Sequence, residues 1–293
     1  MTPHLSRRRT IVVPGGAIAA WEFGPPNAKL DVVFLHANGF NACTYTQILA
    51  PLATEMRLLA IDMRGHGLST LPTEPQGHAW QIYADDLLAV LAALGERPSV
   101  LAGHSMGGAT ALLAAAKLAG GAKLSLVLFD PVIASPEIYA ARAGTQDWDQ
   151  PIVQGALRRK AGFARPAEAM IAYHQRGAFK TWPDAMLADY LRDGLVEQPD
   201  GTWALACAPA WEAANFAAFA TSNPIDGFAA IDGPVHILKA DRDSVCALNS
   251  GESPLTVLPS ARLDVVADTS HFLPMERPDL VHASLRAALG RVG

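Results

Sequence analysis

Short, mainly apolar runs alternate with stretches of helical spacing along most of the chain. Runs of this kind, typical of strands buried on both faces, occupy residues 31–35, 57–61, 100–102, 124–129, 235–238 and 263–266. From Trp80 to Leu94, apolar residues recur at three- and four-residue steps, which predicts a helix that ends at Gly95. Two further helices are predicted over 109–118 and 279–289. The alternation predicts an α/β fold with a mostly parallel central sheet flanked by helices.

The residues from 132 to 225 break this alternation, because they offer helical segments without clear strands between them. Four of the six tryptophans of the chain fall in this stretch. We expect a helical cap, inserted into a core domain made of residues 1–131 and 226–293. The large side chains, of which Trp182 and Trp203 are examples, would either form the cap's own core or line an apolar substrate pocket between cap and sheet.

Two segments carry features of targeting or membrane sequences. Three arginines at 7–9 precede an apolar stretch, which resembles a twin-arginine signal, but Pro14, Gly15 and Gly16 within it favour two short strands around a tight turn. Residues 98–116 carry no formal charge, yet their glycines, serines and His104 are typical of a strand, a turn and a helix at a site. We therefore predict no membrane span.

Composition narrows the class of protein further. The chain has 293 residues, of which 50% are hydrophobic and 17% charged, and a formal net charge of −5. These values are typical of a compact globular protein and speak against nucleic acid as the main partner. The three cysteines lie far apart, which fits neither a disulfide framework nor a zinc site and favours a reducing cytoplasm. No metal-ligand spacing occurs among the nine histidines, so we expect neither metal nor cofactor.

The strongest chemical signal is G-x-S-x-G at 103–107, between a predicted strand and a predicted helix. A serine on such a sharp turn projects its hydroxyl beyond the carboxyl end of the sheet. Ser105 is therefore the predicted nucleophile. Its hydroxyl needs a base that takes its proton, and that base needs an orienting carboxylate. Among the histidines, His271 lies in a loop between the last predicted strand and the last helix, and it is the predicted base.

Four segments together resemble the α/β-hydrolase superfamily, over nearly the whole chain except the cap. They are the turn His36-Ala37-Asn38-Gly39-Phe40, the D-x-R-G-H-G-x-S loop at 62–69, the nucleophile elbow at 103–107 and the H-x-x-x-x-E-x-P segment at 271–278. The first departs from the family pattern, with Ala37 where glycine is usual. The resemblance implies an α/β-hydrolase fold and an oxyanion hole made by the backbone N–H groups of Asn38 and Met106. It also implies that the 62–69 loop is architectural.

The carboxylate that orients the histidine has two candidates. Asp243 follows the predicted strand at 235–238, which is the usual family place, and we favour it. Asp130 closes the strand at 124–129, and some members of the superfamily carry their acid there. Both lie at the carboxyl end of the sheet, and both keep the chain order serine, aspartate, histidine.

A serine nucleophile excludes the dehalogenases and epoxide hydrolases of the superfamily, which use aspartate. We expect hydrolysis of a small carboxylic ester or acyl thioester with an apolar acyl group, through an acyl-enzyme. Lactones, peptides with an N-terminal proline and carbon–carbon bonds stay open, as does a non-catalytic ligand-binding protein on this fold. The run Arg158-Arg159-Lys160 is either a solvated helix face or a site for a phosphate of an acyl-CoA. The sequence leaves the oligomeric state open.

Overall fold

The computed structural model describes residues 6–118, 123–142, 144–249 and 261–290. An eight-stranded sheet with the order β1-β2-β4-β3-β5-β6-β10-β11 forms its centre. β1 pairs antiparallel with β2, and β2 pairs antiparallel with β4, whereas the other neighbours are parallel. The strands of this sheet are β1 Ser6–Val13, β2 Gly16–Phe23, β3 Val32–Leu35, β4 Leu58–Ile61, β5 Val100–His104, β6 Ser125–Phe129, β10 Val235–Ala240 and β11 Ala261–Val266.

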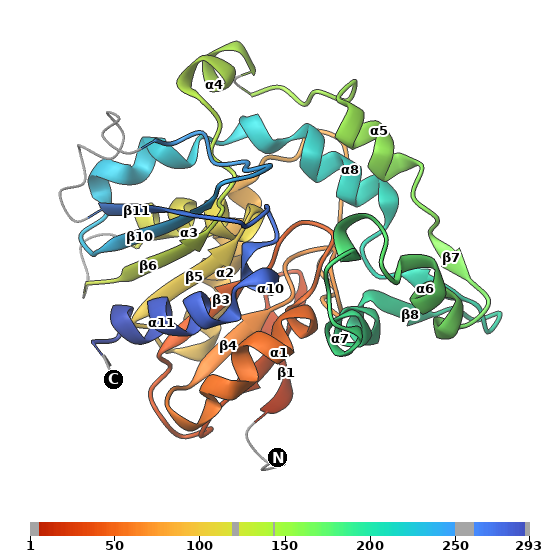
Figure 1. The fold of residues 1–293 in the computed structure, drawn as a ribbon, viewed down its shortest axis with the longest axis horizontal. Coiled ribbons are helices and arrows are strands. Elements are labelled where there is room, and N and C mark those ends of the chain that lie inside the picture. Colours follow the sequence, from red (N-terminus) through yellow and green to blue (C-terminus); the bar gives the residue numbers. More distant parts are fainter. Residues whose placement is uncertain (1–5, 119–122, 143, 250–260, 291–293) are drawn as a thin grey trace.

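Helices cover both faces of the sheet, as Figure 1 shows. Alternate residues of β3 belong to different core clusters: Val33 packs with the residues of α2 and α3, and Val32 with those of α1 and α11. Both faces are thus buried, which explains why the central strands are continuous apolar runs. The helices of the core are α1 Thr46–Leu49, α2 Gln81–Leu94, α3 Met106–Lys117, α10 Leu273–Glu276 and α11 Pro278–Ala288, with the 3-10 helices η1 Ala42–Tyr45, η2 Ala50–Thr54 and η5 Pro224–Ala230.

The predicted parallel sheet and its helices are present, with small shifts at the ends. The helix expected from Ala109 begins at Met106, because Gly107 and Gly108 belong to its first turn. The predicted helix stop at Gly95 is confirmed: this residue ends α2 in the left-handed conformation, with φ 62°. The N-terminal strands form the expected hairpin, in which Gly15 has φ 87°.

The segment 136–221, between β6 and β10, contains most of the remaining helices and lies at one side of the main sheet (Figure 1). We call it the cap. The expectation of helices without strands was wrong in one respect, because the cap contains a three-stranded antiparallel sheet with the order β7-β9-β8. Strands of two or three residues are too short to produce an alternating pattern. The cap elements are α4 Pro136–Arg142, α5 Pro151–Leu157, β7 Gly162–Phe163, α6 Pro166–Tyr173, η3 Gly177–Phe179, α7 Asp184–Gly194, β8 Leu195–Glu197, β9 Trp203–Leu205, α8 Pro209–Ala217 and η4 Phe219–Thr221.

The cap shares its apolar packing with the core instead of forming a separate unit. Trp211 of α8 belongs to the same cluster as Tyr83 of α2, and Trp182 belongs to the cluster that contains Phe34 of β3. The domain boundaries at 131/132 and 225/226 stay a prediction. Phe228 of η5 packs in the same cluster as Leu112 of α3, so the chain has rejoined the core by that point.

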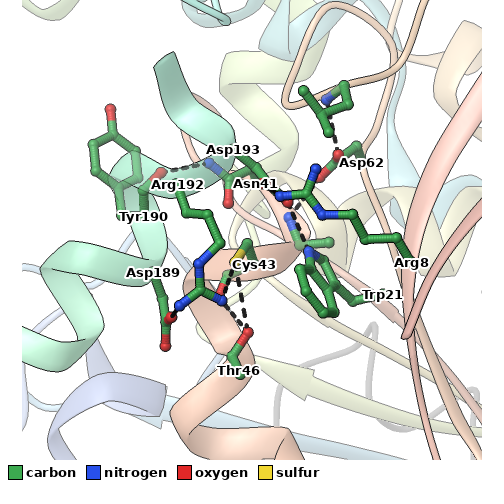
Figure 2. A network of polar contacts seen from close by, with 12 residues as sticks. Arg8, Trp21, Asn41, Cys43, Thr46, Asp62, Asp189, Tyr190, Arg192 and Asp193 are labelled. Carbon is green, nitrogen blue, oxygen red and sulfur yellow. Dashed lines mark hydrogen bonds and ion pairs between the residues drawn. The ribbon is translucent and has the colours of Figure 1, made fainter. Parts of the chain in front are cut away.

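A polar network also fastens cap helix α7 to the N-terminal hairpin (Figure 2). The buried carboxylate of Asp193 pairs with Arg8 of β1 and accepts a hydrogen bond of 2.6 Å from the indole of Trp21 in β2. One turn earlier, Asp189 pairs at 2.6 Å with Arg192, whose guanidinium also contacts the thiol of Cys43. The cap is therefore also held to the core through the N-terminal hairpin.

Candidate active site

The nucleophile elbow joins β5 to α3, and Ser105 sits at its tip with φ 57° and ψ −119°. This strained backbone persists only because its neighbours fix it. A Cβ at Gly103 would lie 2.4 Å from the backbone of Gly107, and a Cβ at Gly107 would lie 2.3 Å from the carbonyl oxygen of Leu35. Both flanking positions of G-x-S-x-G therefore require glycine.

The structure brings Ser105, His271 and Asp130 into one chain of hydrogen bonds. Nε2 of His271 lies 3.0 Å from Oγ of Ser105, and Nδ1 of His271 lies 2.6 Å from Oδ2 of Asp130. Because the carboxylate accepts a hydrogen bond from the N–H at Nδ1, Nε2 is left without a proton and can accept the proton of the serine hydroxyl. This is the arrangement that nucleophilic catalysis by serine needs.

Asp130 is fully buried at the end of β6 and is held by three further donors. Its oxygens accept hydrogen bonds from the hydroxyl of Ser244 at 2.5 Å and from the backbone N–H groups of Ala240 and Val245. Burial by itself raises the pKa of the Asp130 carboxyl, but His271 and these donors outweigh it, so that the pKa lies below its ordinary value. Asp130 is thus kept as a carboxylate.

The preference for Asp243 beside the histidine is corrected by this geometry. Asp243 lies in the turn after β10 with φ 54° and an exposed side chain, and it forms no hydrogen bond or ion pair with any described residue. The same turn instead supplies Ser244 and Val245, which bond to Asp130. Sequence position alone did not separate the two aspartates, because both follow neighbouring parallel strands.

Asn38 and Met106, the predicted oxyanion-hole residues, both line the cavity at Ser105. Met106 is the first residue of α3, where a helix leaves its N–H groups without acceptors of its own. The side chain of Asn38 is fixed to the cap: its amide donates to the carbonyl of Glu212 at 3.0 Å, and its oxygen accepts from Asn215 at 2.9 Å. Cap helix α8 therefore helps to hold the turn after β3 in position.

A second set of hydrogen bonds joins this turn to the histidine loop through His104, which the sequence places in the nucleophile elbow without specifying its contacts. The N–H of Ala37 donates to the hydroxyl of Tyr45 at 3.1 Å, and this hydroxyl lies 2.8 Å from Nδ1 of His104. Nε2 of His104 lies 2.7 Å from the carbonyl oxygen of His271. A carbonyl only accepts, so Nε2 carries the proton and Nδ1 accepts from Tyr45.

This arrangement requires a neutral His104. Burial, together with the nearby His271, lowers the pKa of His104 to about 3. The ring is thus a neutral support that holds the backbone of the histidine loop. We call Ala37, Tyr45 and His104 the histidine-loop support.

The 62–69 loop makes the contacts of an architectural element. The N–H of Met63 donates to Nε2 of His36 at 2.9 Å, and the N–H of Gly39 donates to Nε2 of His66 at 3.1 Å. Arg64 forms two hydrogen bonds with Asp86 of α2, at 2.6 and 2.9 Å. Burial lowers the pKa of His66 to about 4 and the pKa of His36 well below its ordinary value, so both rings are neutral supports of the turn after β3.

The Ser105 cavity has a volume of about 350 Å³ and lies between sheet and cap. Its walls are mostly apolar, and Phe216 and Phe219 of the cap contribute to them, whereas Trp182 is buried in the cap's packing. Some cap aromatics thus line the cavity, and others form the apolar packing of the cap. The remaining walls are Ala37, Asn38, Phe40, Trp80, Met106, Val132, Ala134, Gln150, Ile152, Ala178, Glu212, Val245, His271 and Phe272.

Glu212 is the charged group in these walls that lies against the predicted oxyanion turn. A Cβ at Gly39 would come within 2.5 Å of Oε1 of Glu212. Arg159 pairs with the same carboxylate at 2.8 Å and donates to the hydroxyl of Tyr190 at 2.6 Å. The pair offsets a negative charge close to the place where an oxyanion would form.

Neither a metal cluster nor a membrane-spanning helix occurs in the described part of the chain. None of these residues form a group of three or more histidine, cysteine, aspartate or glutamate side chains suited to a metal ion. Within the same residues, no helix combines the length and apolar character needed to cross a membrane.

Comparison with known proteins identifies the family. A model of the alpha/beta hydrolase family matches residues 32–284, so the chain belongs to this family, and the predicted fold is confirmed. Its relatives include a non-heme haloperoxidase of Rhodococcus erythropolis, 25% identical over 82% of this chain and 84% of that protein. A bifunctional esterase/perhydrolase of Acinetobacter calcoaceticus is 23% identical over 91% of this chain and 93% of that protein.

Solved structures share the fold. A thermophilic esterase from Thermogutta terrifontis superposes with a TM-score of 0.66 at 24% identity, over 97% of this chain and 98% of that chain. Because the chain belongs to the alpha/beta hydrolase family, the protein is an enzyme of the hydrolase class.

Proposed function

We propose that this enzyme is a serine hydrolase that cleaves a carboxylic ester or an acyl thioester with an apolar acyl group. The observation that carries the proposal is the hydrogen-bonded chain from Ser105 through His271 to Asp130, which opens into a mostly apolar cavity. The names of the relatives as esterases support the ester class. The cap aromatics at the cavity support an apolar acyl group.

In the first half of the proposed reaction, Oγ of Ser105 attacks the carbonyl carbon while Nε2 of His271 takes the hydroxyl proton. The carbonyl oxygen becomes an oxyanion that accepts hydrogen bonds from the N–H groups of Asn38 and Met106. Collapse of this intermediate breaks the bond to the leaving oxygen or sulfur, which receives the proton from His271. The carboxylate of Asp130 stabilises the imidazolium and fixes its orientation.

In the second half, a water molecule attacks the acyl group on Ser105 and gives its proton to His271. The bond from the acyl carbon to Oγ then breaks, Oγ regains its proton, and the carboxylic acid leaves. No cofactor takes part in either half.

The direct test compares Ser105→Ala with Ser99→Ala on p-nitrophenyl esters of graded chain length, acyl-CoA thioesters and lactones. Ser99 directly precedes β5, at the end of that strand opposite Ser105, so it is a matched control. We expect Ser105→Ala to lose more than about 10³-fold in kcat without unfolding, and Ser99→Ala to keep wild-type rates. Unchanged turnover in Ser105→Ala would refute the proposal.

The same panel separates the bond classes that the sequence left open. Peptides with an N-terminal proline and a dienoic acid with a cleavable carbon–carbon bond extend the panel to peptidase and carbon–carbon hydrolase activity. Tight binding of a panel member without turnover by the wild type would instead favour a ligand-binding protein.

A further inference from the structure

A groove of about 640 Å³ adjoins the Ser105 cavity on the cap. The two hollows share wall residues from the core and from three cap segments, namely Phe40, Ile152, Ala178, Glu212 and Phe216. A substrate whose scissile bond lies at Ser105 can therefore extend past these residues into the groove. We call it the cap groove; its further walls include Arg159, Tyr173, Arg176 and Phe179.

The two arginines of the cap groove differ in their partners. Arg159 is committed to Glu212 at 2.8 Å and to the Tyr190 hydroxyl at 2.6 Å. Arg176 is exposed, and its guanidinium donates to none of the described residues. Since Glu212 offsets Arg159, Arg176 leaves the lining with an excess positive charge next to walls that are otherwise mainly apolar.

A neutral donor lies in the same lining. The hydroxyl of Tyr173 is buried and has no hydrogen-bond partner among the residues that the structure describes. The ring of this tyrosine packs 5.2 Å from Cζ of Arg159. A buried hydroxyl without a partner costs stability, so an acceptor that reached this hydroxyl on binding would gain a hydrogen bond from it.

We propose that the cap groove binds an anionic group at the far end of the substrate, a carboxylate or a phosphate, through the guanidinium of Arg176 and the hydroxyl of Tyr173. This inference rests on the proposed function, because it assigns the far end of a substrate that is cleaved at Ser105. A guanidinium binds either anion through paired hydrogen bonds. The substrate thus has an apolar stretch between its scissile carbonyl and its charge.

The structure also revises the site suggested by the basic run at 158–160. Arg159 within it is neutralised by Glu212, and Arg158 is exposed and lines neither hollow. The available cation comes from Arg176 instead. Arg158→Gln is accordingly the matched control, since it removes the same charge from the cap without changing either wall.

The test uses esters that end in a carboxylate, a phosphate or a methyl group, with spacers of equal length. One series carries the terminal group on the acyl side and another carries it on the alcohol side. We expect Arg176→Gln to lower kcat/KM for one anionic series by about tenfold and to leave the methyl-ended esters within about twofold. Tyr173→Phe lowers the same series by a smaller factor, and Arg158→Gln changes neither.

Comparison of the carboxylate and phosphate arms identifies the anion. Equal effects of Arg176→Gln on charged and methyl-ended esters would overturn the inference and leave the proposed function intact. Failure of the wild type to cleave any ester would instead count against the proposed function.

Binding provides a readout that does not depend on turnover. In the Ser105→Ala background, calorimetry with the best anionic ester is expected to show about tenfold weaker binding after Arg176→Gln. Equal affinity with and without Arg176 would also overturn the inference.

Discussion

Two aspartates are almost completely shielded from solvent, Asp130 at the candidate active site and Asp62 next to the network that holds α7 to the N-terminal hairpin, yet their pKa values shift in opposite directions. The pKa of Asp130 lies below its ordinary value, whereas burial raises the pKa of Asp62 to about 7. Asp130 accepts from a histidine, a hydroxyl and two backbone N–H groups. Asp62 accepts from two backbone N–H groups, those of Ala42 and Leu68. The nearby charge of Asp193 raises its pKa and that of Arg8 lowers it (Figure 2).

The difference shows that the number and kind of donors, more than burial, decide whether an aspartate in this core is charged. A base-orienting carboxylate has to be charged at neutral pH. Asp62, in the architectural 62–69 loop, has no such requirement, since either of its forms can accept from the two N–H groups.

The strongest test of this contrast removes the charge of Asp130 and keeps the shape of its side chain. Asp130→Asn keeps the volume but removes the charge and the preferred tautomer of His271. We expect kcat to fall by about 10³- to 10⁴-fold on the best ester. Asp243→Asn, the control at the aspartate that the sequence favoured, is expected to keep kcat within about twofold.

Both variants are compared at matched folded fraction, followed by circular dichroism. An equal or deeper loss in Asp243→Asn would contradict the pairing of His271 with Asp130.

The second test checks the raised pKa of Asp62 through the pH dependence of protein stability. Its folded pKa of about 7 exceeds the ordinary value of 3.8, so its neutral form is the one that the fold favours. Its contribution to stability is therefore complete below about pH 4 and is lost as the pH rises to about 7, with a total of about 4 kcal/mol. Denaturant unfolding of wild type and Asp62→Asn at several pH values measures it.

The difference in unfolding free energy between wild type and Asp62→Asn separates the contribution of Asp62 from that of the buried histidines. The histidines change stability with pH in the opposite direction. Because the pKa values of His66 and His104 are lowered to about 4 and about 3, these residues reduce stability on acidification below about pH 6.5. A difference in unfolding free energy that stays constant from pH 4 to pH 8 would contradict the raised pKa of Asp62.

A third test addresses the neutral histidine-loop support. Tyr45→Phe removes a hydroxyl that accepts from Ala37 and donates to Nδ1 of His104. We expect the free energy of unfolding to fall by about 1–3 kcal/mol, because two buried polar groups lose their partner. We also expect a drop of about tenfold in kcat with little change in KM, since the histidine loop and the oxyanion turn lose their link.

A tyrosine outside the network provides the control. Tyr139→Phe removes a hydroxyl that accepts from the N–H of Ala134, so it too breaks a hydrogen bond made by a buried tyrosine. If both variants lose stability alike and neither changes kcat, the support has a structural role alone.

Much of this molecule follows from local pattern in the sequence, as the central strands and the nucleophile elbow illustrate. Runs such as 124–129 are apolar because both faces of the sheet are covered, and Gly103 and Gly107 are glycines because backbone lies where a Cβ would be. The residues under these constraints lie within a few positions of one another in the sequence, so they form a pattern that can be recognised without the structure.

Contacts between distant loops leave no comparable signal. The choice of Asp130 depends on how the turn with Ser244 folds over the end of β6, and the sequence favoured Asp243 instead. The histidine-loop support joins residues from three separate segments. Its tyrosine, Tyr45, lies in a 3-10 helix that the apolar pattern did not predict. The strands of the cap sheet are likewise too short to show an alternation of apolar and polar residues.

The central claim, that Ser105 is the nucleophile activated by His271 and Asp130, is tested most directly by covalent trapping. A p-nitrophenyl alkylphosphonate forms a stable bond to an activated serine and releases p-nitrophenolate. We predict one phosphonyl group per chain on the peptide that contains Ser105, full loss of esterase activity, and labelling that is at least about 10³-fold slower in Asp130→Asn. Inactivation with the label on another residue, or ester turnover that survives full labelling of Ser105, would contradict the account.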